Sequence, residues 1–271
     1  MAHSPAQVTS AIVVFDIDGV IRDVSGSYRL ALADTVEHFT QGAFRPSPQM
    51  IDTLKTEGLW NNDWEASREL IYRHHEAQGQ NRSQVALDYD AIVSFFQSRY
   101  RGPDPDHWTG YICHEPLLVQ PAYFEALNQA QISWGFFSGA TRGSAGYILE
   151  KRLGLQAPVL VAMEDAPGKP DPTGLFEVVQ QLETCDQLKP GMPVIYVGDT
   201  VADLQTIQQA RKRQPQREWI GVGVLPPHAQ QSAEYADTYT SNLEQVEAKI
   251  VLGNVEQLDP NMIRLLVGQS Y

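Results

Sequence analysis

The hydrophobic positions of this chain fall into short continuous runs rather than into an alternating pattern. Uninterrupted apolar stretches of this length are typical of strands that are buried on both faces of a parallel sheet. Amphipathic helical patterns lie between the later runs, and this alternation predicts an α/β fold with a doubly wound parallel sheet. The predicted strands are residues 11–15, 132–137, 158–163, 194–197 and 219–224.

Helical patterns with a period of 3.6 residues predict the segments that cross from one strand to the next and cover the sheet. A weaker strand at residues 235–240 and a helix at residues 243–251 would complete the fold. The chain beyond residue 256 carries no chemical signal. The crossover helices are predicted at residues 124–130, 143–152, 173–182 and 201–211.

The connection between the first two predicted strands, residues 16–131, is far longer than an ordinary crossover. Its periodic segments are helical, so we predict an all-helical domain inserted at residues 22–113, with residues 1–21 and 114–271 forming the core domain. The Pro- and Gly-containing stretch at residues 101–106 is typical of a linker. The inserted helices are predicted at residues 28–40, 49–57, 64–76 and 89–101.

Chemically active side chains follow four of the predicted strands. Ligands of doubly wound sheets bind beyond the carboxyl ends of the strands, so we expect the four segments to meet there. Together they carry an acidic pair, a hydroxyl, a lysine and a second acidic pair. The segments are DIDG at residues 16–19, SGAT at 138–141, GKP at 168–170 and GDTVAD at 198–203.

One residue separates Asp16 from Asp18 at an extended chain end, where their charges repel unless a cation lies between them. Mg²⁺ suits this position because it prefers carboxylate oxygens together with water and phosphate. Asp16 could then attack a bound phosphorus atom as a nucleophile. Asp18 could protonate the leaving oxygen and later deprotonate water. The alternative for both residues is a turn or cap at a strand end.

The other segments supply groups that can hold a phosphoryl group. Lys169 and the hydroxyl of Ser138 can contact its oxygens as negative charge spreads over them. The main-chain amides of Gly139 and Ala140 add an anion-binding end just before a helix. Ser138 could instead cap that helix, and Lys169 could be an exposed turn residue.

The four segments, in this order, resemble the motifs of the haloacid-dehalogenase superfamily, in its subfamily I phosphatase branch with a helical cap inserted after the first motif. The resemblance spans residues 11–252. It implies a Rossmann-like core, with Asp16 as the nucleophile and Asp18 as the acid/base. Gly139 departs from the pattern, because Asn more often follows the hydroxyl residue of the second motif. That departure bears on a substrate contact and not on the phosphate contact.

The same resemblance implies a Mg²⁺ site. Its ligands would be Asp199, the Asp16 carboxylate and the main-chain oxygen of Asp18. Asp203 would support either Lys169 or the surroundings of the metal. As an alternative, Asp199 and Asp203 could cap the helix that follows them.

The composition narrows the range of partners. A formal net charge of −13 disfavours nucleic acid and anionic membrane surfaces. No segment approaches the roughly 18 apolar residues that a membrane span requires, and residues 1–10 lack the basic start and apolar core of an export signal. Cys113 and Cys185 are typical of free thiols in a reducing compartment. We therefore expect a cytoplasmic protein, and the inserted cap favours a small phosphorylated metabolite as its partner.

The expected activity is hydrolysis of a small phosphomonoester, such as a sugar phosphate or phosphoglycolate, through a phospho-aspartyl intermediate on Asp16. Three alternatives stay open: a sugar phosphomutase of the same fold, a phosphonate hydrolase, and a non-catalytic binding protein. A phosphonate hydrolase needs a lysine in the inserted domain, and Lys55 is the only lysine there. The sequence does not indicate an oligomeric state.

The inserted domain carries weaker signals. Residues 60–64 (WNNDW) are either a specificity loop that reaches toward the site or a helix start with Asp63 as the N-cap. Arg29 is a candidate contact for a substrate anion, although a surface role is commoner. His74 and His75 are expected at the surface of a polar helix.

Overall fold

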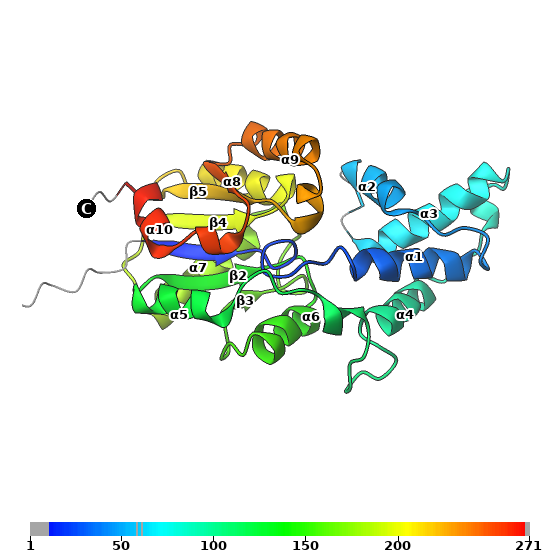
Figure 1. The fold of residues 1–271 in the computed structure, drawn as a ribbon, viewed down its shortest axis with the longest axis horizontal. Helices are drawn as coiled ribbons and strands as arrows, with labels where there is room; N and C mark the ends of the chain where they lie inside the picture. Colours follow the sequence, from blue (N-terminus) through cyan, green and yellow to red (C-terminus); the bar gives the residue numbers. More distant parts are fainter. Residues whose placement is uncertain (1–10, 58, 61, 269–271) are drawn as a thin grey trace, which may run out of the picture. The chain divides into compact units, whose positions relative to one another are not determined.

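The computed structural model of the chain describes residues 11–57, 59–60 and 62–268. The described chain divides into two compact units (Figure 1). One unit holds the amino-terminal segment up to Asp23 and the chain from Leu117 onward, and the other runs from Val24 to Pro116. The first unit contains the strands and the second is helical, so each is described by itself.

Among the described residues, six parallel strands form one sheet in the first unit, in the order β3-β2-β1-β4-β5-β6. The chain begins in the middle of the sheet and winds outward in both directions. The direction of winding therefore reverses between β1 and β4, where doubly wound sheets bind their ligands. The predicted fold class is confirmed. The strands are β1 (Ile12–Phe15), β2 (Ser133–Phe137), β3 (Leu160–Val161), β4 (Val194–Gly198), β5 (Trp219–Val224) and β6 (Ile250–Leu252).

Apolar side chains cover both faces of the central strands, which explains why these strands read as continuous hydrophobic runs. On one face, Val14 and Tyr196 belong to a buried cluster with Leu175 of α7. On the other, the ring of Phe15 meets that of Phe124 edge to face. The helical segments of this unit are α5 (Pro121–Gln129), α6 (Arg142–Gly146) with a π-helical continuation (Tyr147–Arg152), α7 (Thr173–Cys185), α8 (Val201–Arg213), 3₁₀ turns at Pro227–Gln230 and Val255–Gln257, α9 (Ala233–Gln245) and α10 (Pro260–Leu266).

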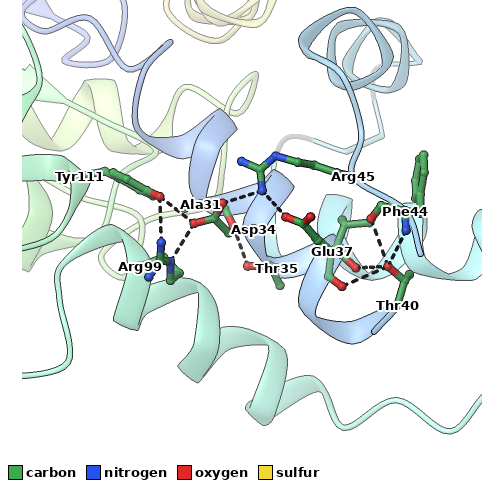
Figure 2. A network of polar contacts seen from close by, with 10 residues as sticks. Ala31, Asp34, Thr35, Glu37, Thr40, Phe44, Arg45, Arg99 and Tyr111 are labelled. Atoms are coloured by element: carbon green, nitrogen blue, oxygen red, sulfur yellow. Dashed lines mark hydrogen bonds and ion pairs between the residues drawn. The ribbon is translucent and has the colours of Figure 1, made fainter. Parts of the chain in front are cut away.

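The second unit packs α1 against α3 and α4. A polar network adds to this packing (Figure 2): Asp34 of α1 accepts hydrogen bonds from Arg45 (2.8 Å), from Arg99 of α4 (2.7 Å) and from the hydroxyl of Tyr111 (2.7 Å). These bonds lower the pKa of Asp34 although partial burial opposes the shift. The helices are α1 (Tyr28–Phe39), α2 (Pro48–Thr56), α3 (Asp63–Ala77) and α4 (Tyr89–Tyr100), with 3₁₀ turns at Arg82–Gln84 and Tyr111–His114.

Two sequence predictions near the carboxyl end are wrong. Residues 235–240 are not a strand but part of α9, which begins where Ser232 accepts a hydrogen bond from the amide of Tyr235 (3.2 Å). The tyrosines and threonines that favoured a strand are exposed or half-buried on this helix, where β propensity decides little. The predicted helix at residues 243–251 is wrong as well, because its end forms β6, which pairs with β5.

A last helix, α10, lies in the segment without chemical signal. Asp259 caps it by accepting hydrogen bonds from Asn261 N (2.9 Å) and Met262 N (2.8 Å), and Pro260 occupies its first turn. Across the described part of the chain, no helix is both long and apolar enough to cross a membrane.

Candidate active site

The ends of β1 and β4 bring two of the predicted acids together. The strands pair in parallel with Phe15 opposite Val197, and Asp16 N donates to Val197 O at 2.8 Å. Asp16 and Asp199 therefore leave neighbouring strands at the same edge of the sheet. This edge lies at the point where the winding direction reverses, which is the usual ligand position in such sheets.

Three buried carboxylates form a tight group at this edge. One oxygen each of Asp16, Asp199 and Asp203 lies within 4.8 Å of the others. The three residues are only 5%, 7% and 1% exposed, respectively. Ionised carboxylates so close together in a buried place repel strongly unless cations lie among them.

Lys169 supplies one such cation. Its Nζ lies 2.7 Å from Oδ1 of Asp16 and 2.6 Å from Oδ1 of Asp203, and its side chain is 11% exposed. The ammonium group also lies over the rings of Phe137 and Tyr196, at 5.4 and 5.5 Å from their centres. The interpretation of Lys169 as an exposed turn residue is therefore wrong, because the GKP loop carries it into the acidic group.

Asp203 is held by its own helix. Its Oδ2 accepts hydrogen bonds from the amide (3.0 Å) and the hydroxyl (2.5 Å) of Thr200, which is the N-cap of α8. Its Oδ1 accepts from the hydroxyl of Tyr196 (2.8 Å) and pairs with Lys169. Asp203 thus takes part in capping α8 and at the same time supports the lysine, whereas the N-cap itself is Thr200 and not Asp199.

Burial and the neighbouring charges shift the pKa values of these acids in different directions. Burial, with the charges of Asp203 and Asp18, raises the pKa of Asp16 to about 7 although Lys169 opposes the shift. Burial, with the charges of Asp203 and Asp16, raises the pKa of Asp199 well above its ordinary value. Burial would raise the pKa of Asp203 too, but the charge of Lys169 and hydrogen bonds from Lys169 and Thr200 hold it below its ordinary value.

The pKa of Lys169 is raised, because the attraction of Asp16 and Asp203 outweighs the cost of burying the ammonium group. The lysine therefore stays charged, and its single positive charge faces three carboxylates. In the metal-free protein this imbalance favours protonation of Asp16 and Asp199.

Two glycines make the close approach of these acids possible. Gly19 has a positive φ of 75°, and a Cβ at this position would overlap the carboxylate of Asp199. A Cβ at Gly198 would overlap the side chain of Asp203. Both glycines belong to the motifs identified in the sequence, and the structure explains their presence by backbone approach to an acid.

Ser138 directly follows β2, the neighbour of β1 on the side away from β4. Its side chain is buried, and its Oγ accepts a hydrogen bond from the amide of Ala140 (3.1 Å). The alternative that it caps the next helix is wrong, since Thr141 is the N-cap of α6. Apart from Gly139 and its two chain neighbours, no heavy atom of the described residues lies within 4 Å of where a Cβ on Gly139 would stand, so this backbone is open on that side. A phosphate contact by Ser138 and Gly139 stays a prediction.

Asp18 lies outside the group formed by the three buried acids, although it is only two residues from Asp16. Its carboxylate pairs with Arg22, whose Nε and Nη2 lie 2.7 and 2.6 Å from Oδ1. The Asp18 side chain is 29% exposed, whereas that of Arg22 is fully buried. The sequence analysis assigned no role to Arg22. The signal that could have identified it is an arginine four residues after an acid within one tight loop.

The donor set fits a divalent cation with oxygen ligands. Oδ1 of Asp16 is buried, and the ammonium group of Lys169 lies 2.7 Å from it. Asp203 is already engaged by Lys169, Thr200 and Tyr196. Asp16 and Asp199 are therefore the carboxylates better placed to bind a metal ion. A second cation beside Lys169 would offset the excess of negative charge.

The candidates in the helical unit have partners of their own. Arg29 forms an ion pair with Asp52, so its charge is already compensated. The N-cap of α3 is Asn62, which accepts hydrogen bonds from the amides of Trp64 and Glu65, and the prediction of Asp63 as the cap is wrong. Residue 61 lies outside the described residues.

Asp63 instead pairs with Lys55 at 2.5 Å. The ring of His74 stacks on that of Phe44, with 5.1 Å between their centres. His75 meets His74 edge to face. Neither histidine belongs to a metal-binding group among the described residues.

Comparison with known proteins places this site in a family. The profile of haloacid dehalogenase-like hydrolases matches residues 11–211, which include all four motif segments. A protein from Phytophthora nicotianae named imidazoleglycerol-phosphate dehydratase is 28% identical over 257 residues, which are 92% of this chain and 50% of that protein. This chain thus spans about half the length of that relative.

Two solved structures share the fold. A phosphatase, Tt82, from Thermococcus thioreducens has a TM-score of 0.60 and 22% identity over 78% of this chain and 92% of its own. A phosphonoacetaldehyde hydrolase-like protein from Oleispira antarctica has a TM-score of 0.63 and 16% identity over 100% of this chain and 99% of its own. By the match to its profile, the chain belongs to the family of haloacid dehalogenase-like hydrolases.

Proposed function

We propose that the protein is a Mg²⁺-dependent phosphatase that hydrolyses a small phosphomonoester through a phospho-aspartyl intermediate on Asp16. The observation that carries this proposal is the position of Asp16. It directly follows the central strand β1, where Oδ1 lies 2.7 Å from the ammonium of Lys169 and near a second buried acid, Asp199. A carboxylate nucleophile, a fixed cation and a metal-binding acid are the parts that phosphoryl transfer to aspartate requires.

In the first step, a carboxylate oxygen of Asp16 attacks the phosphorus atom and the bond to the leaving oxygen breaks. Asp18 gives its proton to that oxygen, so the alcohol departs neutral. Lys169, the Ser138 hydroxyl and the amides of Gly139 and Ala140 hold the equatorial oxygens as charge spreads over them. These donors are fixed before the reaction, which avoids a reorganisation cost in the transition state.

In the second step, Asp18 takes a proton from a water molecule as the water oxygen attacks the phosphorus atom. The bond between phosphorus and Asp16 breaks, which releases inorganic phosphate and restores the carboxylate. Mg²⁺, held by Asp16, Asp199 and the main-chain oxygen of Asp18, would neutralise charge on the phosphoryl oxygens. The overall acidity of the chain then does not exclude an anionic substrate.

We further propose that residues 22–113 act as a cap that selects the substrate and excludes water during the transfer. A capped site suits a small metabolite better than a phosphoprotein. The partners we propose are therefore a small phosphorylated metabolite in the cytoplasm, with no nucleic acid and no membrane surface.

A phosphomutase would share the intermediate but return the phosphoryl group to a sugar. A phosphonate hydrolase would need a free amine in the cap for an imine, and the only lysine of residues 22–113, Lys55, is paired with Asp63. That ion pair argues against imine formation. A non-catalytic binder would have no need for a nucleophile beside a lysine.

The test is turnover of p-nitrophenyl phosphate with Mg²⁺, followed by a panel of metabolite phosphates. We expect release of inorganic phosphate, with sugar phosphates and phosphoglycolate among the better substrates. Imidazoleglycerol phosphate belongs in the panel because of the name of the Phytophthora nicotianae relative. Transfer of the phosphoryl group to a second sugar position would favour the mutase, and no turnover across the panel would favour the binder.

Mg²⁺ should stabilise the fold, and more so at higher pH. Burial raises the pKa of Asp16 to about 7 and that of Asp199 above its ordinary value, so protons compete with the metal below neutrality. In the metal-free protein these raised values make stability fall as pH rises from the ordinary carboxyl range through about 7. At 100 times its Kd, Mg²⁺ adds about 2.7 kcal/mol, which raises Tm by roughly 5–10 °C.

The measurement is thermal unfolding with Mg²⁺ or EDTA at about pH 8 and about pH 5.5. The rise in Tm should be large at the higher pH, small at the lower pH and absent in the Asp199→Asn variant at both. An equal rise in Tm for the wild type and Asp199→Asn would remove Asp199 from the metal site.

A further inference from the structure

Arg22 is the largest fully buried side chain of the described residues. Two of its nitrogens contact the same oxygen of Asp18, Oδ1: Nε at 2.7 Å and Nη2 at 2.6 Å. Asp18 itself is 29% exposed, so it could be solvated without a buried arginine. Burying a guanidinium is costly, and these two contacts with Asp18 offset part of that cost while they fix the position of Oδ1.

The backbone fixes Arg22 from two sides. Its amide donates to Ile17 O (3.2 Å) and its carbonyl accepts from Gly19 N (2.9 Å), which closes the loop after β1. On the other side it forms an antiparallel bridge with Leu117, where the chain re-enters the first unit, and Leu118 N donates to Ile21 O (2.8 Å). The backbone of Arg22 is thus held in place, so its side chain can fix the position of Asp18.

The ion pair also separates two kinds of carboxylate. Asp16, Asp199 and Asp203 share one buried group, whereas Asp18 lies outside it. A carboxylate so near to a divalent cation would otherwise be drawn to it and lost for proton transfer. A guanidinium that grips one oxygen also fixes where the second oxygen of that carboxylate lies.

We propose that Arg22 is a positioning residue for proton transfer: by holding Oδ1 of Asp18, it keeps this carboxylate apart from the metal-binding acids and orients it toward the leaving group and the attacking water. The inference rests on the proposed function, because it assigns Arg22 to the acid/base of that reaction. It makes Arg22 necessary for steps that need a proton, and much less so for attack by Asp16.

The experiment compares Arg22→Met with Arg22→Lys, using two substrates that differ in their leaving group. p-Nitrophenolate departs without much help from an acid, whereas an alkoxide needs a proton. For Arg22→Met we expect kcat/KM to fall by about 10²-fold or more for an alkyl phosphate, and by less than about tenfold for p-nitrophenyl phosphate. Arg22→Lys should recover part of the loss, since an ammonium can still contact one oxygen.

Deprotonation of water is the second step that depends on Asp18. With p-nitrophenyl phosphate, Arg22→Met should therefore release one equivalent of p-nitrophenol per enzyme in a burst, followed by slow turnover, as phosphorylated Asp16 accumulates. The wild type should show a smaller burst. Because the first step is nearly intact in this variant, the burst cannot be explained by partial unfolding.

The matched control is Arg217→Met in the same unit. The side chain of Arg217 is 10% exposed and pairs with Glu183 at 2.6 Å, so this variant also loses a largely buried ion pair. Arg217→Met should lower Tm but leave the ratio of kcat/KM for the alkyl phosphate to kcat/KM for p-nitrophenyl phosphate unchanged. For Arg22→Met, equal losses on both substrates without a burst would overturn the inference while leaving the proposed function intact. Absence of turnover by the wild type would contradict both the proposed function and the inference about Arg22.

Discussion

Asp16→Asn should lose at least about 10⁴-fold in kcat on p-nitrophenyl phosphate, because an amide cannot form the phospho-enzyme. The substitution keeps the size of the side chain but removes the nucleophile. The phosphorylated intermediate should be trapped on the wild type by rapid acid quench and be absent from the variant. Measurable turnover at the wild-type rate in Asp16→Asn would exclude Asp16 as the nucleophile.

The loss of activity in Asp16→Asn should not come from unfolding. Burial already raises the pKa of Asp16 to about 7, which means that its ionised form destabilises the metal-free fold at higher pH. An amide removes that charge, so we expect the Tm of metal-free Asp16→Asn at about pH 8 to equal or exceed that of the wild type. Asp237→Asn, at an exposed position of α9, is the control that should change neither activity nor Tm.

The sheet could be predicted wherever burial on both faces left an apolar run. The strands β1, β2, β4 and β5 lie within or beside the predicted runs, because covered parallel strands admit few polar residues. Residues 235–240 misled the prediction, since tyrosine and threonine favour strands only in a pleated, half-buried setting. The short apolar run of β6 was absorbed into a predicted helix, although it pairs with β5 at the edge of the sheet.

The convergence of the acidic segments could also be predicted, because parallel strands present their carboxyl ends at one edge. The partners of each acid could not. Asp18 and Arg22 read as neighbours in a loop, and nothing in the sequence indicates that the arginine is fully buried or that its backbone forms a bridge with Leu117. In the same way, Asn62 and Asp63 are both good N-cap residues, and the sequence offers no means of choosing between them.

Among the substitutions in the candidate active site, Lys169→Met should lower the stability of the fold the most. Removing one partner of a buried ionic group typically lowers the free energy of unfolding by about 3–5 kcal/mol, and here the lysine contacts two carboxylates at 2.7 and 2.6 Å. Phosphatase activity should fall as well, because the lysine is the fixed cation that faces the phosphoryl group. Urea unfolding of the metal-free variant at about pH 8 measures the loss, which should appear as a lower midpoint.

The loss of unfolding free energy caused by Lys169→Met should become smaller as pH falls. In the wild type, Lys169 holds the pKa of Asp203 below its ordinary value, so the stabilising contribution of Asp203 persists down to the ordinary carboxyl range. Without the lysine, burial raises the pKa of Asp203 and raises that of Asp16 further, and protonation at about pH 5.5 then relieves the buried charge. Lys55→Met is the matched control: its ion pair with Asp63 is half-exposed, so its loss should cost about 0–1 kcal/mol. An equal deficit for Lys169→Met at both pH values would show that the lysine stabilises the fold by packing rather than by its charge.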